Sequence, residues 1–401
     1  MRIGFFLGGI SAERNVSLES GRNVYEKINS RGIHKTIPIF VTGRVDDIKL
    51  YIIPLSLLFK DNADIIAETI KNFKRSLVEK DEDLQKMLED YVEDDVCKVV
   101  TEISFDLLPK IIDFAFLALH GAPGEDGTFQ KILDDLKIPY NGSSAEVSKL
   151  CMNKYLTNRL LAQHGILVAN QYVVDADDWT ANKFKILQEI EHQFAFPFVI
   201  KPVDDGSSVG VFIVDNLKTL EHYLDTVFLL EDHKEEFKNV TIVYHKQILI
   251  EDLITGNGTK KFLEVTGGFL THKKEDGSIE YEMFSPSESV AINQILSMEE
   301  KFLSGEGQNI TPGRYDADPK ENLRIDNIVK EELKKVATIL NLRGYARIDA
   351  FVKVFSDHVE VWVIEVNTLP ALTPATCIFH QCILNGYSPA DFIHKIIDFS
   401  L

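Results

Sequence analysis

The stretch VIEVNTLPALTP, residues 363–374, places two polar side chains in an otherwise apolar strand. Glu365 and Asn367 are two positions apart, so on an extended strand both side chains point to the same face. The neighbouring Val and Ile residues predict that this strand is largely buried. A buried carboxylate is costly unless another group neutralises it, so the stretch predicts a partner for Glu365.

A second strand offers that partner. The sequence YARIDAF, residues 345–351, puts Arg347 and Asp349 on one face by the same alternation, and hairpin pairing of the two strands would gather four side chains. Two carboxylates and an amide oxygen are ligands that Mg²⁺ prefers, which makes Asp349, Glu365 and Asn367 candidate metal ligands. A buried ion pair of Arg347 with Asp349 or Glu365, without any metal, explains the same residues. The two strands alone leave both interpretations open.

A loop rich in glycine and serine follows another predicted strand. In FPFVIKPVDDGSSVGVFIV, residues 196–214, Lys201 ends the strand and Ser207 and Ser208 follow in the loop. Glycines allow the backbone to approach an anion closely, and amide and hydroxyl groups can donate to phosphate oxygens. No GK[ST] sequence precedes a helix, so this is not a Walker loop. A polar hairpin turn explains the composition equally well.

Two more loops follow apolar strands. The loop GGISAERNVS, residues 8–17, contains Glu13 and Arg14, and the stretch FAFLALHGAPGEDGTFQ, residues 114–130, contains His120. Ligands of open α/β sheets bind at the carboxyl ends of strands, which is where both loops lie. Ordinary turns and charges in the first turn of a helix are the alternative explanation.

Length, charge and cysteine content narrow the class of protein. A chain of 401 residues with 45% hydrophobic content can form two or three domains with their own cores. Acidic residues outnumber basic ones by 62 to 43, and the net charge of -19 predicts no binding to nucleic acid or anionic membranes. Four cysteines without CxxC spacing suit a reducing cytoplasm. The opening apolar run, Ile3 to Ile10, is too short for a signal peptide or a membrane span.

The order of strand-like and helical runs predicts an α/β (α+β) chain of three domains. Residues 1–142 alternate strands and helices, the pattern of a parallel sheet. Residues 143–250 and 251–401 read as two successive α+β units, which suggests a nucleotide held between them.

Three further stretches have helical patterns. The charge-dense segment at about 60–98, with apolar residues at helical spacing from Ile66 to Leu77, predicts one or two surface helices inserted into the first domain. The second domain is predicted to open with a single helix that Gly165 closes, and the third to contain a helix over residues 327–340.

Together these stretches resemble the D-alanine–D-alanine ligases, a family of the ATP-grasp superfamily. The motifs that carry the resemblance occur in the family's order and spacing, and they are GGISAERNVSLESG, HGAPGEDGTFQ, MNKYLTNRLL, KPVDDGSSVGV, ILIEDLITG, GYARIDAF and IEVNTLPALTP. The resemblance covers most of the chain except the insert at 60–98 and the segment near 256–300. It implies the ATP-grasp fold, with ATP held between the central and C-terminal domains.

The resemblance also assigns nucleotide and metal contacts. The residues implied to bind ATP are Lys154, Lys201 and Ser208 at the phosphates and Glu251, Asp252 and Leu253 at the adenine hinge. The residues implied to hold two Mg²⁺ ions, with Mn²⁺ as an alternative, are Asp349, Glu365 and Asn367.

A further set of residues is implied to handle the substrates. Glu13, linked to Ser207, would engage the ammonium group of the first D-alanine. Arg347 and the backbone amide of Ala371 would stabilise the developing oxyanion. The other residues implied to line the substrate site are His120, Phe302, Thr376 and Cys377.

The activity that the resemblance implies is ATP-dependent ligation of two D-alanines through an acyl phosphate, in cytoplasmic synthesis of peptidoglycan precursors. The alternatives are ligation of D-alanine to D-lactate, another carboxylate–amine ligation, and a nucleotide-binding protein without turnover. The expected partners are small molecules rather than nucleic acid or membrane, and a homodimer is left open.

The chain departs from the family at three positions of the site. Gly258 falls where the family commonly has a carboxylate that contacts the ribose. Ala371 replaces a glycine, which keeps the amide but restricts φ. Phe302 falls where peptide-forming members usually have a tyrosine, and this substitution is the reason to keep D-lactate as an alternative acceptor.

Overall fold

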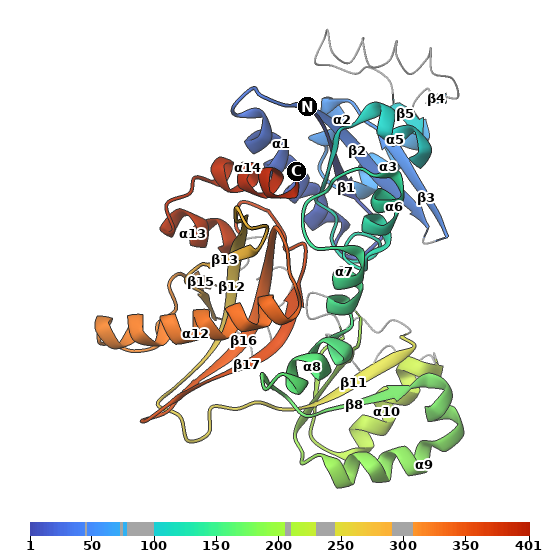
Figure 1. Ribbon diagram of the computed structural model, residues 1–401. Coiled ribbons are helices and arrows are strands. Elements are labelled where there is room, and N and C mark those ends of the chain that lie inside the picture. The colour runs from blue at the N-terminus through green and yellow to red at the C-terminus, as the bar shows by residue number, and fades with distance from the viewer. Residues whose placement is uncertain (45, 73–74, 78–99, 205–209, 230–244, 291–307) are drawn as a thin grey trace.

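The described part of the chain folds around three β-sheets. The computed structural model describes residues 1–44, 46–72, 75–77, 100–204, 210–229, 245–290 and 308–401 (Figure 1). The predicted site residues Ser207, Ser208 and Phe302 therefore lie outside the described residues. None of the helices in the described ranges is both long and apolar enough to cross a membrane.

The first sheet has the strand order β4-β5-β3-β2-β1-β6. Its centre is parallel, as the alternation of strands and helices predicts, because β1 (Arg2–Gly8) pairs in parallel with β2 (Lys35–Arg44) and β6 (Phe114–Leu117). The antiparallel strand β3 makes the sheet mixed. The remaining elements of this unit are α1 (Arg14–Asn29), β3 (Asp47–Ile52), α2 (Leu55–Leu58), α3 (Ala63–Asn72), β4 (Arg75–Leu77), β5 (Val100–Ile103), the 3₁₀ turn Phe105–Leu107, α5 (Leu108–Ile111) and α6 (Thr128–Leu136).

The described residues of the predicted helical insert include one helix, α3, and one strand, β4. Ile66 and Ile70 lie on α3 and are buried in the core of the first unit, so this face is not merely a solvated one. Leu77, predicted to continue the helix, instead ends strand β4, which pairs in parallel with β5. Sheet pairing overrides the helical spacing there. Residues 73–74 and 78–99 of the insert lie outside the described residues.

The second sheet is antiparallel, with the order β10-β9-β11-β8. Its elements are β8 (Gln171–Asp175), α9 (Ala176–Gln193), β9 (Phe198–Pro202), β10 (Phe212–Val214), α10 (Leu217–Leu229) and β11 (Gln247–Asp252). The predicted domain boundary after residue 250 falls inside β11, so we propose to move it beyond Asp252. The chain enters and leaves this sheet at adjacent points, because the backbone N–H of Asp252 donates to the carbonyl of Asn170 at 3.1 Å.

The third sheet has the order β15-β14-β12-β16-β17-β7, with β13 paired to β12. Its strands are β7 (Leu167–Val168), β12 (Lys261–Lys273), β13 (Ile279–Met283), β14 (Ser287–Val290), β15 (Gln308–Ile310), β16 (Tyr345–Val354) and β17 (Val359–Asn367). Helix α12 (Pro319–Ile339) buries one face of the sheet. It begins eight residues before the predicted start at Asn327, because the Asp318 side chain caps it and Pro319 fits the first helical turn.

The single helix predicted before Gly165 is two helices, α7 (Ala145–Met152) and α8 (Lys154–Gln163). Asn153 breaks the pattern, since its backbone is extended and its side chain accepts from the N–H of Leu156 to cap α8. Helix α8 packs against β17, and β7 pairs with β17. The break therefore places Lys154 at the start of a helix that lies along the third sheet.

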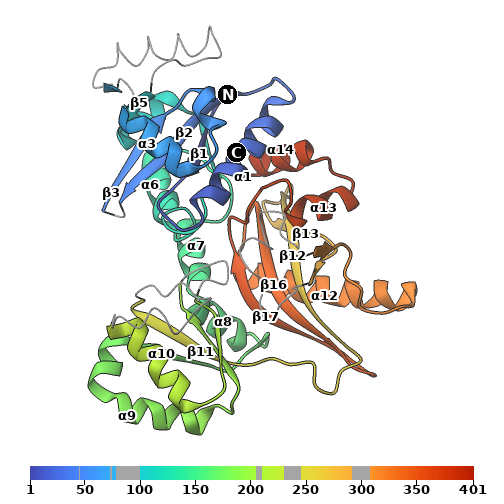
Figure 2. The same ribbon diagram turned by 180° about the vertical axis from the view of Figure 1, so that it is seen from behind.

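The last two helices, α13 (Cys377–Leu384) and α14 (Pro389–Ser400), bring the chain back to the first unit, where α14 lies beside α1 (Figure 1, Figure 2). Arg31 forms an ion pair with Asp391 at this contact. The imidazole rings of His34 and His394 lie 5.5 Å apart between centroids. His34 Nδ1 and His394 Nε2 are buried without a hydrogen-bond partner among the described residues.

We expect this histidine pair to lower stability in acid. Burial holds the pKa of both imidazoles below the ordinary value of 6.5, so the unfolded chain binds more protons and stability is lost as the pH falls from that value. Replacing His34 by Phe keeps a ring and removes one titrating group. The melting temperature of H34F should therefore fall less than that of the wild type between about pH 7 and about pH 5. His164→Phe, at an exposed position, is the control, and equal slopes for H34F and the wild type would contradict the assignment.

Candidate active site

The pairing of β16 with β17 gathers the four predicted side chains. Arg347 lies opposite Asn367, and Asp349 lies opposite Glu365. The hairpin predicted from the two strands is therefore confirmed.

A β-bulge determines which face of β17 carries the polar groups. Val361 and Val363 are buried against the core beneath the sheet, and strict alternation would send Glu365 to the same buried face. The register shifts just after Asp349. Asp349 pairs with Glu365, but the next residue of β16, Ala350, pairs with Val363, so Ile364 is an extra residue on β17. The side chain of Val366 is again buried in the core, and the side chains of Glu365 and Asn367 point to the site.

The structure contains the ion pair that the sequence left as an alternative. Arg347 donates to both oxygens of Asp349, at 3.0 and 2.9 Å, and its nearest nitrogen lies 4.0 Å from a Glu365 oxygen. Thr266, opposite Asp349 on β12, donates to the same carboxylate at 2.5 Å. These contacts neutralise Asp349 within the protein itself.

The same cluster fits a divalent cation by its donor chemistry. The set consists of two carboxylates and one amide, all of which offer the hard oxygen ligands that magnesium takes. Asn367 Nδ2 is buried without a hydrogen-bond partner among the described residues, so this donor lacks an acceptor such as a water or a phosphate oxygen, whereas the amide oxygen is the atom that could bind a metal. The described ranges hold no metal-type cluster of three or more His, Cys, Asp or Glu side chains, so the amide is needed to complete the set.

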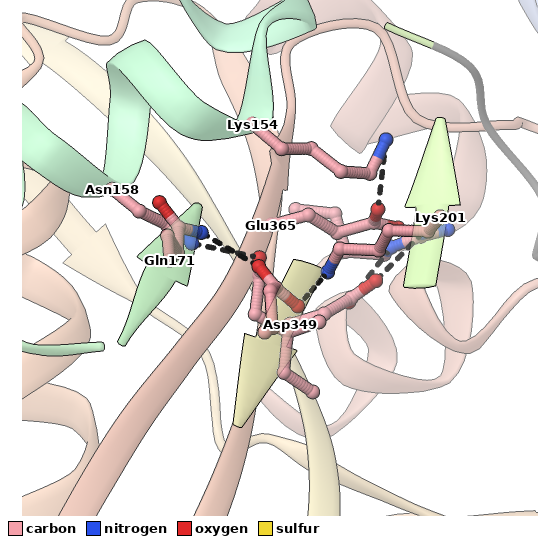
Figure 3. Close-up of polar contacts among 9 residues, drawn as sticks. Lys154, Asn158, Gln171, Lys201, Asp349 and Glu365 are labelled. Atoms are coloured by element: carbon pink, nitrogen blue, oxygen red, sulfur yellow. Dashed lines mark hydrogen bonds and ion pairs between the residues drawn. The ribbon is translucent and has the colours of Figure 1, made fainter. Parts of the chain in front are cut away.

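Two buried lysines form ion pairs with carboxylates in and around this cluster. Lys154 Nζ lies 3.5 Å from Glu365, and Figure 3 shows it reaching from its helix towards that carboxylate. Lys201 Nζ lies 2.5 Å from Glu251 on the neighbouring strand. The backbone N–H of Lys154 donates to the carbonyl of Val203, which ties the start of α8 to the segment just after Lys201. Each ammonium group thus has a carboxylate partner within the protein.

A hollow connects this cluster to the loops of the first sheet. The loop after β1 brings Glu13 to its wall, and the loop after β6 brings His120 and Glu125. The other residues that line the hollow include Lys154, Arg347, Glu365, Asn367 and Ala371. Residues more than 350 positions apart in the chain are therefore brought together, as the sequence predicts for Glu13, Arg347 and Ala371.

His120 is held as a neutral imidazole. Its Nδ1 donates to the carbonyl of Leu369 at 3.1 Å, and its Nε2 accepts from Ser20 Oγ at 2.9 Å. Ser20 Oγ in turn accepts from the N–H of Leu372. Burial lowers the pKa of His120 to about 4, and the charge of Arg347 contributes. His120 therefore positions residues 369–372, which include Ala371, rather than supplying a positive charge.

Glu125 is a site residue that motif reasoning did not select. Its Oε2 accepts from the N–H of Gly121 at 2.7 Å within the loop that carries His120. Removal from water, together with the charge of Glu13, raises the pKa of Glu125 well above the ordinary value of 4.5. The sequence shows a carboxylate in a glycine-rich turn but not its distance from Glu13.

An aromatic row beside the cluster was also missed. Phe351 continues the face of Arg347 and Asp349 along β16, Trp362 lies opposite Phe351, and Phe262 stacks on Phe351 at 5.3 Å between centroids. All three side chains are half-buried and form a flat surface suited to a planar group. The strict alternation in YARIDAF could have indicated Phe351.

The remaining predicted residues occupy varied positions. Asp252 and Leu253 follow Glu251 at the end of β11 and are half-buried. Thr376 and Cys377 are buried at the start of α13, and burial raises the pKa of the Cys377 thiol to about 11.

Two of the positions at which the chain differs from the family, 258 and 371, lie within the described residues. Their backbone conformations differ. Gly258 has a φ of +78° and open space around it, so a side chain there would fit but strain the backbone. Ala371 is not among the described non-glycine residues with positive φ, so its conformation does not require glycine.

Comparison with known proteins identifies the family. The model described as "D-ala D-ala ligase N-terminus" matches residues 2–143, and the one described as "D-ala D-ala ligase C-terminus" matches residues 160–398. The chain belongs to the D-alanine–D-alanine ligase family. A D-alanine–D-alanine ligase from Geobacter sulfurreducens is 28% identical over 397 residues, covering 99% of this chain and 93% of the relative. One from Natranaerobius thermophilus is 26% identical over 375 residues, covering 93% and 87%.

Solved structures of the family share the fold. VanG D-Ala:D-Ser ligase from Enterococcus faecalis aligns with a TM-score of 0.68 and 22% identity, covering 100% of this chain and 99% of that one. D-alanine–D-alanine ligase from Bacillus anthracis complexed with ATP aligns with a TM-score of 0.59 and 23% identity, covering 100% and 96%. These similarities confirm the predicted ATP-grasp fold.

We expect Glu125 to destabilise the protein in alkali. A carboxyl group whose folded-state pKa is raised stabilises the protein at low pH and loses that contribution as the pH rises from its ordinary value of 4.5. Glu125→Gln keeps the shape and the acceptor for Gly121 but cannot ionise. The E125Q variant should therefore melt at a higher temperature than the wild type near pH 8 and at a similar temperature near pH 4.5, measured by calorimetry. Glu191→Gln, on the exposed face of α9, is the control, and a pH-independent difference for E125Q would contradict this account.

Proposed function

We propose that this chain joins two D-alanines at the expense of ATP, through an acyl phosphate, to make a precursor of peptidoglycan. The observation that carries the proposal is that the N-terminal and C-terminal models of the family both match the chain, at residues 2–143 and 160–398. The solved relative from Bacillus anthracis that was complexed with ATP supports the choice of nucleotide. The sparse cysteines support a cytoplasmic setting for the reaction.

The chain's own residues account for nucleotide binding. Lys154 and Lys201 turn from their carboxylate partners to the phosphates, which carry more negative charge than a carboxylate. The aromatic row of Phe262, Phe351 and Trp362 offers the base a flat apolar surface beside the end of β11. The nucleotide thus lies between the second and third sheets.

Asp349, Glu365 and Asn367 would hold magnesium. When bound, the metal would neutralise charge on the phosphates as the terminal phosphoryl group leaves ADP. Asp349 keeps Arg347 oriented by its two hydrogen bonds.

The reaction activates a carboxylate, whose own oxygen is a poor leaving group. An oxygen of the first D-alanine attacks the terminal phosphorus of ATP, the bond to ADP breaks, and D-alanyl phosphate forms. The amine of the second D-alanine, after losing its ammonium proton, attacks the acyl carbon and expels inorganic phosphate. Arg347 and the amide of Ala371 donate to the tetrahedral oxyanion, while Glu13 holds the first substrate's ammonium.

Release of ADP tests the function directly. The purified protein should release ADP only when D-alanine, ATP and magnesium are all present, and D-alanyl-D-alanine should appear in equal amount. ADP release without D-alanine, or binding of ATP with no turnover at any substrate concentration, would overturn the proposal.

We expect Glu365→Gln to abolish turnover and leave the fold intact. The substitution removes one negative metal ligand and the partner of Lys154, so the phosphate charge is no longer balanced, and activity should fall by at least about a hundredfold. Circular dichroism and the melting temperature check the fold. Glu331→Gln, at an exposed position of α12, is the control, and an active, folded E365Q would refute the assignment.

A further inference from the structure

Glu251 is a buried carboxylate with a separate partner on each oxygen. Its side chain is 9% exposed, and the residue lies on β11, an inner strand of the second sheet. Lys201, on β9, places its ammonium nitrogen 2.5 Å from Oε2. Gln171, on β8, donates from Nε2 to Oε1 at 2.6 Å. Gln171 and Lys201 thus approach from strands on opposite sides of β11 (Figure 3).

The two partners play different electrostatic roles. Lys201 neutralises the charge of Glu251, whereas the amide of Gln171 supplies a hydrogen bond without charge. Under the proposed function Lys201 serves the nucleotide phosphates, so Glu251 loses its ammonium partner when ATP binds. A buried carboxylate left without donors carries a large desolvation cost, and that cost would oppose the transfer of Lys201.

We infer that Gln171 is a positioning residue for nucleotide binding, which rests on the proposed function. It holds Glu251 through a neutral hydrogen bond, so that Lys201 can exchange between this carboxylate and the phosphates. A cation at position 171 would compete for the phosphates, and an apolar residue would leave Glu251 dependent on Lys201. Gln171 therefore acts through Glu251 and Lys201 and does not itself contact the phosphates.

The test is the affinity for ATP of a Gln171→Met variant. Methionine keeps the length of the side chain and removes the donor. Titration calorimetry with ATP and magnesium, without D-alanine, should show binding weakened by about tenfold or more, the effect of one hydrogen bond to a charged group. In the ligase assay the KM for ATP should rise in proportion, while kcat at saturating ATP stays within about twofold of the wild type.

The chain provides a matched control on the same pair of strands. Gln247 lies at the other end of the β8–β11 pair and donates at 3.3 Å to Asp175, a carboxylate other than the partner of Lys201. Gln247→Met makes the same substitution against another carboxylate, and its ATP affinity should equal that of the wild type. Equal weakening by Q171M and Q247M would show a general effect on the sheet and overturn the inference.

A double substitution separates positioning from packing. In a Glu251→Gln background there is no charge at 251 to compensate, so adding Gln171→Met should change the ATP affinity by less than about twofold. A loss as large as in the wild-type background would mean that Gln171 only packs, and it would overturn the inference.

The binding measurement also separates this inference from the proposed function. A wild type that binds ATP but forms no dipeptide would leave the Gln171 effect measurable and refute only the choice of substrates. A wild type that binds no ATP would refute both. Unchanged affinity in Q171M, with dipeptide formed normally by the wild type, would refute the inference alone.

Discussion

The register between β16 and β17 is the constraint on which the site depends. Because side chains alternate along a strand, a slip by one residue would exchange the buried and site-facing sets. The buried valines beneath the sheet fix the register of β17, and the bulge then turns Glu365 towards Asp349. Packing of the core and placement of the charges are thus determined by the same pairing.

Three cations described at the site are each paired with a carboxylate of the protein. Arg347 is matched by Asp349, Lys154 by Glu365 and Lys201 by Glu251. A buried ion that lost its partner would carry a large desolvation cost. Each cation must therefore move directly from its carboxylate to another anionic partner. This arrangement explains how a chain with a net charge of -19 can present positive groups to a polyanion.

Alternation along the strands was enough to predict the hairpin and its polar cluster, and the order of motifs was enough to predict the fold. The bulge in β17 was not predictable, because it depends on which valines reach the core beneath the sheet. The break at Asn153 could be read as a helix cap only once the start of α8 was known. The neutral state of His120 depends on burial by loops that are distant in the sequence.

The roles predicted for the site residues depend on their neighbours as well as on their positions. Glu13, Arg347 and Ala371 meet in one hollow, but the partner predicted for Glu13, Ser207, lies outside the described residues. Glu125 shows why position alone is insufficient, since its ionisation depends on burial and on the charge of Glu13, neither of which a local motif reveals.

The hydrogen bond between Asp252 and Asn170 has a consequence for the modularity of the chain. Residues 171–252 begin and end one hydrogen bond apart, which is the geometry of a module inserted at a single point of a host. Such a module connects to its host through two neighbouring backbone segments, so it can turn as a body about them. Lys201 and Glu251 belong to the module and Lys154 and Glu365 to the host, so such a turn would change the distance between the two lysines, and the hydrogen bond from the N–H of Lys154 to the carbonyl of Val203 is a second contact that opposes it.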